Sequence, residues 1–325
     1  MKRALKYLVV GLVVIAVAAW VGLWAWGKSR HAAAGPAALA ALASDAAVTV
    51  EQGEFLVFRP SAGESHLGVI FYPGANCDVR GYAPILRSLA AAGYFVVAVP
   101  MPLEFAFLGP NRARDVQDAF PRVRRWAMIG HSLGGAMAAN FTFHNPDRVA
   151  GIVFWDSYPP SNASLAQFPR PVWQIHRATP DGAAPPALAA ERHLFPAASH
   201  WVPIPGGIHM YFGDFVGGGF VEDWEPTISR DEQIGRVTAA TLEALQEIAA
   251  AGSDAGGKKR APGAGEDDGQ ELRPDQPVTA GIVVFDADVR HFDDRVADIA
   301  VELHDRAWRE LPGSDETDAV WRNIA

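Results

Sequence analysis

The pentapeptide Gly130-His131-Ser132-Leu133-Gly134 places a serine where it could act as a nucleophile. An apolar run at 126–129 enters it and a run of small residues leaves it, which predicts a tight turn from a strand into a helix. The residues two before and two after such a serine must be almost free of side chain, and both are glycine here. The helix dipole at this turn favours negative charge on a reacting oxygen. The spacing therefore predicts that Ser132 acts as a nucleophile.

Attack by a serine hydroxyl needs a neighbouring base, and a histidine commonly fills this role. His209 directly follows Gly206-Gly207-Ile208, just beyond an expected strand at 201–204. This position in a loop at a strand end favours His209 as the base. The competing histidines either stand at a strand end or flank segments that look structural; they are His176, His193 and His200.

The base in turn needs a carboxylate that orients its ring. Asp181 lies in the loop after the expected strand 171–176 and is the preferred candidate. Asp156, directly after the expected strand 149–155, is the alternative acid. Either residue gives the chain order serine, aspartate, histidine, which is one of the orders in which such triads occur.

A turn that could stabilise a negative oxygen follows the expected strand 67–72. In Tyr72-Pro73-Gly74-Ala75-Asn76 the glycine lets the backbone approach a substrate closely. We expect the backbone N–H groups of Ala75 and Leu133 to form the oxyanion hole.

The single cysteine, Cys77, excludes an intrachain disulfide and a cysteine metal cluster.

The elements that must position these residues are apolar strands alternating with helices. Near-continuous apolar strands of this kind predict an α/β fold whose mostly parallel central sheet is covered on both faces. The expected strands are 67–72, 94–99, 126–129, 149–155, 171–176 and 201–204, and the expected helices are 82–92, 114–120, 134–144 and 238–250.

Three motifs together resemble the α/β-hydrolase superfamily: Tyr72-Pro73-Gly74, Gly130 to Gly135, and Gly207-Ile208-His209. The resemblance extends over about residues 55–250 and is greatest with the small, lid-poor branch called hydrolase family five, which is similar to dienelactone hydrolases and small lipases. It implies an α/β-hydrolase fold, a small-molecule ester or acyl substrate, and hydrolysis through a Ser-Asp-His triad and an acyl-enzyme. It also implies that the reaction uses no metal and no cofactor. The alternatives are an acyltransferase on the same scaffold and a non-catalytic binding protein of the same fold.

The first thirty residues predict a membrane anchor. An uncharged run over 8–26 is long enough to span a bilayer as a helix, and basic residues flank it on both sides. Three tryptophans crowd its far end, where such rings suit the membrane interface. We expect a single-pass protein of the cell membrane, with the N-terminus inside and the catalytic domain extracytoplasmic. A signal peptide cleaved near Ala32-Ala33-Ala34 is the alternative.

The remaining chain divides by composition. We expect a connector over 31–54, a catalytic domain over 55–251, a flexible linker over 252–277, and an acidic extension with one amphipathic helix over 278–325. From Ser253 onward 17 acidic residues stand against 9 basic ones, so this tail carries a charge of −8 out of the net −9 of the 325-residue chain. This balance argues against nucleic-acid binding. The extension is either a solvated appendage packed on the main domain or a module that binds a partner protein.

Overall fold

The computed structural model describes residues 30–61 and 66–257, together with individual helical residues between 6 and 25. No helix within this described part is both long and apolar enough to cross a bilayer. Much of the anchor expected over 1–30 lies outside the described residues, as do most of the linker and the whole acidic extension expected over 278–325.

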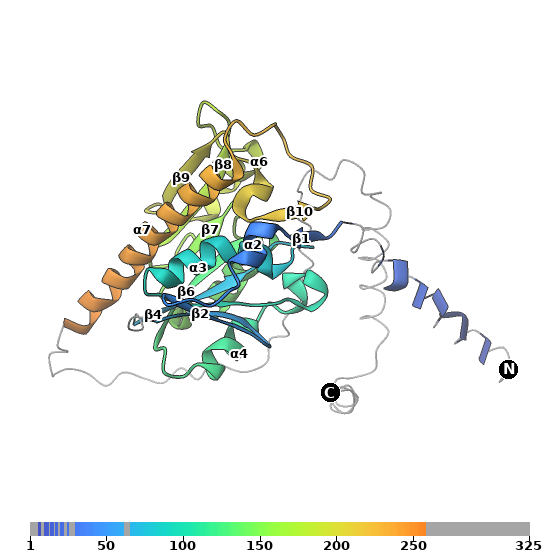
Figure 1. Ribbon diagram of the computed structural model, residues 1–325, viewed down its shortest axis with the longest axis horizontal. Coiled ribbons are helices and arrows are strands. Elements are labelled where there is room, and N and C mark those ends of the chain that lie inside the picture. Colours follow the sequence, from blue (N-terminus) through green and yellow to red (C-terminus); the bar gives the residue numbers. More distant parts are fainter. Residues whose placement is uncertain are drawn as a thin grey trace, which may run out of the picture. The chain divides into compact units, whose positions relative to one another are not determined.

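An eight-stranded sheet forms the centre of the fold, in the order β2-β3-β5-β4-β6-β7-β8-β9 (Figure 1). Strands β2 and β3 pair antiparallel, and β3 pairs antiparallel with β5. The remaining pairings, from β5 through β4 to β9, are all parallel. This confirms the mostly parallel sheet that the sequence predicts. The strands are β2 (Val48–Gln52), β3 (Leu56–Pro60), β4 (Leu67–Tyr72), β5 (Phe95–Ala98), β6 (Arg125–His131), β7 (Gly151–Trp155), β8 (Val172–Ala178) and β9 (His200–Pro205).

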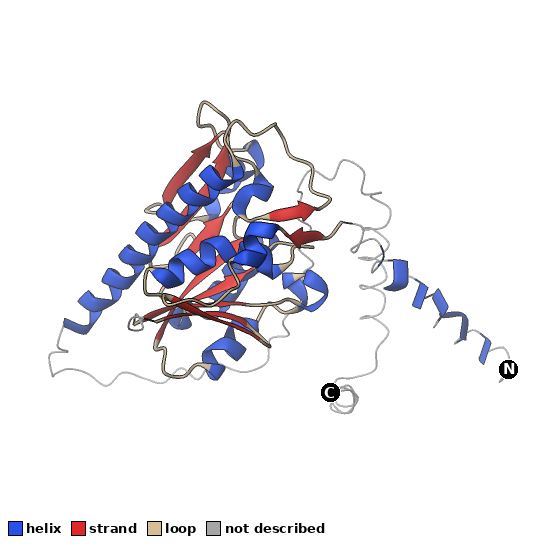
Figure 2. Ribbon diagram, in the orientation of Figure 1, coloured by secondary structure: helices blue, strands red, loops and turns tan. Residues whose placement is uncertain are grey.

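Helices cover both faces of this sheet (Figure 2). Helices α3 (Ala83–Ala91) and α7 (Arg230–Gly257) contact each other on one face. Helices α4 (Arg112–Ala119) and α5 (Leu133–His144) lie on the other face, where Arg114 Nη2 donates to Asn145 Oδ1 at the end of α5 at 2.6 Å. The short helix α6 (Pro186–Ala190) follows β8.

The alternation of side chains along β4 explains why this strand is apolar throughout. Val69 and Phe71 pack into the core shared with α3 and α7. Tyr72 points to the opposite face, where its hydroxyl accepts a hydrogen bond from the backbone N–H of Ala113 in α4 at 2.6 Å. Since all six residues of β4 are buried, neither face of the strand could tolerate a polar side chain without a partner.

The connector expected over 31–54 is a structured part of the fold, which corrects that expectation. It contains β1 (Ala32–Ala34), α2 (Pro36–Ala40) and β2. Strand β1 pairs with β10 (Phe215–Gly217), and β2 extends the central sheet. Helix α7 likewise continues to Gly257, beyond the point where the linker was expected to begin. The elements β1, α2 and β2 are short and partly exposed, so they lack the continuous apolar pattern of the central strands.

Helix α7 completes the core on its face of the sheet. Leu245 and Ile248 are fully buried, and Thr241 accepts a hydrogen bond from the indole N–H of Trp155 in β7 at 3.0 Å. Arg125, at the start of β6, donates to the carbonyls of Ile248 and Ala249. The stability of the sheet therefore depends on this helix.

Leu245→Ala is expected to lower the free energy of unfolding by about 2–5 kcal/mol, because it leaves a cavity between α7 and the sheet. Denaturant-induced unfolding of the purified protein measures the change. The neighbouring Gln246 is exposed, and Gln246→Ala should change the free energy of unfolding by less than about 0.5 kcal/mol. Equal, small effects of both substitutions would contradict the packing of α7 described above.

Candidate active site

Ser132 stands at the turn between β6 and α5, where the sequence places it. Its backbone has φ 52° and ψ −128°, a conformation that non-glycine residues rarely adopt. It serves as the N-cap residue of α5, with its own N–H donating to the carbonyl of Trp155 at 3.1 Å. The hydroxyl therefore lies beside the positive end of a twelve-residue helix.

The glycines around Ser132 are required by close backbone contacts. A Cβ atom on Gly134 would stand 2.2 Å from the carbonyl oxygen of Tyr72, and one on Gly130 would stand 2.5 Å from the Cα of Gly135. Both distances are far shorter than real Cβ contacts. The glycine spacing seen in the sequence is therefore a steric condition for the turn.

Three residues with unusual backbone conformations follow three adjacent strands. Asn76 (φ 54°), Ser132 (φ 52°) and Asp156 (φ 47°) come after β4, β6 and β7, which are neighbours in the sheet. Because these strands are parallel, their carboxyl ends meet at one edge. Strained residues that cluster in this way commonly mark a functional site.

His209 and Asp156 form a buried hydrogen-bonded pair at this edge. The distance between His209 Nδ1 and Asp156 Oδ2 is 2.5 Å, and only 3% of the aspartate side chain is exposed. The His209 ring also contacts the ring of His131, the residue before the serine, with 4.5 Å between centroids. A ring whose Nδ1–H donates to a carboxylate has Nε2 left to accept a proton. This arrangement suits a general base.

The other three histidines engage other groups. His176 Nδ1 lies 2.7 Å from the carbonyl oxygen of Arg177, and His193 Nδ1 lies 3.0 Å from that of Ala190. His200 stacks on Trp173 and lies 3.2 Å from a carboxylate oxygen of Glu247.

Asp181, the preferred acid of the sequence analysis, does not reach His209, and Asp156 takes that position. Asp181 is exposed and accepts a hydrogen bond from the hydroxyl of Thr179, in a turn that Gly182 closes with φ 91°. The turn begins beyond the end of β8, one strand further from Ser132 than β7. Asp156 directly follows β7, which pairs with the strand that carries the serine.

Arg177, which the sequence analysis did not single out, lies against this pair. Its Nη1 stands 2.5 Å from Asp156 Oδ2 and 3.0 Å from His209 Nδ1, and its Nη2 stands 2.5 Å from Asp223 Oδ2. Burial alone would raise the pKa of the Asp156 carboxyl. The charge of Arg177 and the hydrogen bond from His209 outweigh burial, and they hold this pKa well below its ordinary value. Asp156 is therefore ionised when His209 needs an acceptor.

A segment after β10 supports His209 from the other side. Both carboxylate oxygens of Glu222 accept backbone hydrogen bonds, from the N–H of His209 at 2.8 Å and from that of Met210 at 2.7 Å. The ring of Phe220 stacks on His209 with 4.2 Å between centroids. No motif in the sequence indicates these contacts, because they join positions brought together only by folding.

His131 is a buried neutral histidine between the serine turn and the core. Its Nδ1 lies 2.8 Å from the hydroxyl of Tyr82, which also accepts a hydrogen bond from the N–H of Gly74 at 3.0 Å. Burial, reinforced by the charge of the neighbouring His209, lowers the pKa of His131 well below its ordinary value. Tyr82 thus links the serine turn to the loop after β4.

The two amides expected to bind an oxyanion occupy suitable places. Leu133 is the first residue of α5. In the loop after β4, the N–H of Gly74 bonds to Tyr82 and that of Asn76 bonds to the carbonyl of Glu104 at 3.1 Å. Within the described residues the N–H groups of Ala75 and Leu133 have no acceptor. Their use as an oxyanion hole stays a prediction.

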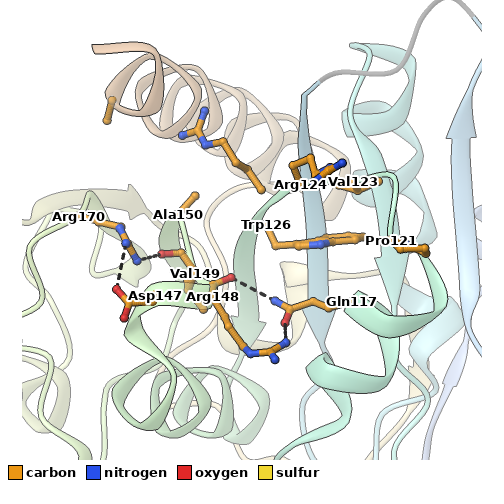
Figure 3. Close-up of a pocket in the computed structure, with 12 residues that line it drawn as sticks. Gln117, Pro121, Val123, Arg124, Trp126, Asp147, Arg148, Val149, Ala150 and Arg170 are labelled. Carbon is orange, nitrogen blue, oxygen red and sulfur yellow. Dashed lines mark hydrogen bonds and ion pairs between the residues drawn. The ribbon is translucent and has the colours of Figure 1, made fainter. Parts of the chain in front are cut away.

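A surface hollow of about 420 Å³ lies at the opposite end of the sheet. It includes Trp126 at the start of β6, whereas Ser132 follows the end of that strand. Figure 3 shows that several of its polar side chains bond to one another and to the backbone, as Arg148 does with Gln117 and Arg170 does with the carbonyl of Val149.

Among the described residues, no group of three His, Cys, Asp or Glu side chains could hold a metal ion.

Comparison with known proteins places this geometry in context. The model of a family described as the alpha/beta hydrolase family matches residues 68–234. A putative carbamate hydrolase, RutD of Variovorax paradoxus, is 26% identical over 217 residues, which make up 61% of this chain and 77% of that protein. Two solved structures are similar in fold. The ferulic acid esterase of Streptomyces cinnamoneus has a TM-score of 0.44 at 22% identity, covering 58% of this chain and 68% of that one. A soluble variant of the monoglyceride lipase of Saccharomyces cerevisiae has a TM-score of 0.43 at 11% identity, covering 63% of this chain and 98% of that one.

Asp156→Asn is expected to lower kcat for a short-chain ester by about 10³ to 10⁴-fold with a much smaller change in KM, because the amide no longer fixes the tautomer of His209. The matched control is Asp181→Asn, which should leave kcat within about twofold of the wild type because its side chain is exposed. Circular dichroism checks that both variants fold. A crippled Asp181→Asn protein beside an active Asp156→Asn protein would reverse the assignment.

Proposed function

We propose, since the chain belongs to the alpha/beta hydrolase family, that it hydrolyses carboxylic esters or related acyl bonds with Ser132, His209 and Asp156. The chain is an enzyme of the serine-hydrolase type. One observation supports the triad most strongly. The buried pair of His209 and Asp156, at 2.5 Å, lies against the residue next to a serine in a strained strand-to-helix turn.

The proposed reaction begins when Ser132 Oγ attacks the carbonyl carbon of the ester and its proton passes to His209 Nε2. The carbonyl oxygen takes up negative charge, which the N–H groups of Ala75 and Leu133 stabilise. The tetrahedral intermediate then expels the alcohol, which receives the proton from His209, and an acyl-enzyme remains. Water, deprotonated by the same histidine, attacks this ester, releases the carboxylic acid and restores the serine hydroxyl.

Asp156 and Arg177 act on the histidine in this scheme. The ionised carboxylate fixes the His209 ring with Nδ1–H toward it and stabilises the imidazolium formed during attack. Arg177 holds the carboxylate in place through the 2.5 Å contact, and Asp223 fixes Arg177 in turn. A positive guanidinium this close would disfavour the imidazolium if Asp156 were absent. We therefore assign Arg177 as a positioning residue whose charge is balanced by two aspartates.

The range of acyl bonds is part of the proposal. The relative from Variovorax paradoxus is named a putative carbamate hydrolase, and carbamates present the same kind of carbonyl carbon to a serine nucleophile as esters do. A substrate panel should therefore contain both esters and carbamates. Addition of an alcohol acceptor to the same assays distinguishes transfer of the acyl group from hydrolysis.

Ser132→Ala is expected to abolish both ester hydrolysis and covalent labelling by an active-site fluorophosphonate, because the nucleophilic oxygen is gone. Intact-protein mass spectrometry measures the labelling, and a chromogenic short-chain ester measures turnover. Ser88→Ala, which changes an exposed serine in α3, should leave both unaffected. Full labelling of the Ser132→Ala protein would rule out Ser132 as the nucleophile.

We further propose that the chain is held in the cell membrane by its first thirty residues, with the catalytic domain outside the cytoplasm. The uncharged run over 8–26 and its tryptophan-rich end support this. The structure of the following segment supports retention of the anchor. Ala32 is buried, and β1 pairs with β10, so cleavage after Ala34 would remove a strand from the domain.

The full-length protein is expected to stay in the membrane fraction after carbonate extraction, because a spanning helix is not released when surface charges are neutralised. Protease added to intact cells should digest the catalytic domain if it is extracytoplasmic. Recovery of a soluble protein that begins near Gly35 would contradict the anchor. Digestion only after cell lysis would reverse the orientation.

A further inference from the structure

Two segments expose large apolar side chains, one against the loop that follows β4 and one against His209. The first is the loop after β5, which carries Leu103, Phe107 and Leu108. The second runs from β10 into the loop that follows it and carries Val216, Phe220 and Val221. Phe107 is 52% exposed and Val221 is 82% exposed. We call these six residues the apolar rim. A group of exposed apolar side chains around a site commonly marks an interaction surface.

The rim borders the proposed catalytic groups on two sides. Phe220 stacks directly on His209, with 4.2 Å between centroids. On the other loop, the carbonyl of Glu104 accepts a hydrogen bond from the N–H of Asn76, next to the proposed oxyanion amide of Ala75. The two loops of the rim therefore contact His209 on one side and the loop of the proposed oxyanion hole on the other.

The backbone of the first loop is strained in a way that presents the rim. Leu103 and Glu104 both have positive φ, 51° and 65°, although neither is a glycine. Leu103 remains half exposed in this conformation. Residues held in such conformations commonly cluster at functional sites.

The chain enters the domain between the two loops of the rim. His31 Nδ1 lies 2.8 Å from a carboxylate oxygen of Glu104, and Arg30 Nη1 donates to the carbonyl of Gly219 at 3.4 Å. Directly after them, the N–H of Ala32 donates to the carbonyl of Asn76 at 2.8 Å, and β1 pairs with β10. Residues 30–32 thus contact both loops of the rim and the loop of the proposed oxyanion hole.

This entry point lies close in sequence to the proposed membrane anchor. Four residues, 27–30, separate the tryptophan-rich end of the apolar run from His31. Even fully extended, they span only about 14 Å. Two of the four, Lys28 and Arg30, are basic, so the apolar run ends before this segment. A tether this short allows only the part of the domain around residue 31 to approach the bilayer.

We propose that the apolar rim rests on the bilayer in which the chain is anchored, and that the substrates are long-chain acyl esters taken directly from the membrane. In this arrangement the rim buries its side chains at the lipid surface, and the acyl carbonyl reaches Ser132 without crossing water. The inference rests on the proposed hydrolase activity and on the proposed anchor, and it deepens both by naming the substrate class and the membrane-facing surface.

A direct test measures where the rim lies, without any use of activity. Val221→Cys in the full-length protein is labelled with an environment-sensitive fluorophore and reconstituted into vesicles of phosphatidylcholine and phosphatidylglycerol. The native Cys77 is buried and stays unlabelled. Lipids carrying a quencher on the acyl chain should strongly quench the fluorophore at position 221. Phe143→Cys is the matched control, because Phe143 is also exposed but lies at the far end of α5 from Ser132. Equal quenching, or none, at both positions would overturn the docking.

A second test links the rim to the substrate. The variant Leu103→Ser/Phe107→Ser/Val221→Ser should lose at least about tenfold in turnover of a fluorogenic long-chain ester held in the same vesicles. Its turnover of soluble p-nitrophenyl acetate should stay within about twofold of the wild type, as should both activities of Phe143→Ser. Undiminished turnover of the vesicle-borne ester by the rim variant would overturn the substrate assignment. If the wild type cleaves neither ester while the label at position 221 is quenched, the proposed activity fails and the docking stands.

Discussion

The positive φ of Ser132 is the constraint on which the rest of the site depends. A serine at φ 52° and ψ −128° is strained, and such residues persist only where the surrounding structure fixes them. Here the turn is fixed on one side by β6, in the middle of the sheet, and on the other by α5. Gly130 and Gly134 leave room for the backbone of the neighbouring elements. The same geometry places Ser132 at the carboxyl end of β6, directly before the first turn of α5.

Charge at this edge is arranged around one buried carboxylate. Asp156 receives hydrogen bonds from His209 and from Arg177, and Arg177 is paired again with Asp223. An isolated buried carboxylate would be costly, whereas a paired one can stay ionised. This explains how the structure tolerates an arginine so close to a histidine proposed as a base. It also ties the loop containing Asp223, more than forty residues along the chain from Arg177, to the chemistry.

The segment that enters the domain connects the site to the rest of the chain. Residues 31–34 make hydrogen bonds to the loop after β4 and to β10. They are therefore held at the edge of the sheet where the parallel strands end, which is also the edge where Ser132 lies. If the preceding residues anchor the chain, the position of the anchor and the orientation of the active site are set by the same few contacts. An unstructured connector over 31–54 would have left the position of the anchor and the orientation of the active site independent of each other.

The sequence by itself determined the central strands, the parallel sheet and the position of Ser132. Buried strands need apolar residues on both faces, and the turn needs glycines at fixed offsets, so both leave local patterns. The edge strand β2 left no such pattern, because four of its five residues are partly or fully exposed.

Only the tertiary structure showed that Asp156 and not Asp181 contacts His209, and only it revealed the contacts of Arg177, Glu222 and Phe220. Both aspartates follow strand ends and satisfy the same chain order, so no local pattern separates them. The choice depends on which strand lies next to β6 and on how the chain turns after it. Asp156 leaves the adjacent strand with φ 47° and reaches His209, whereas Asp181 is held in an exposed turn beyond β8. Contacts between residues distant in sequence are set by the order of strands in the sheet, which a single sequence does not display.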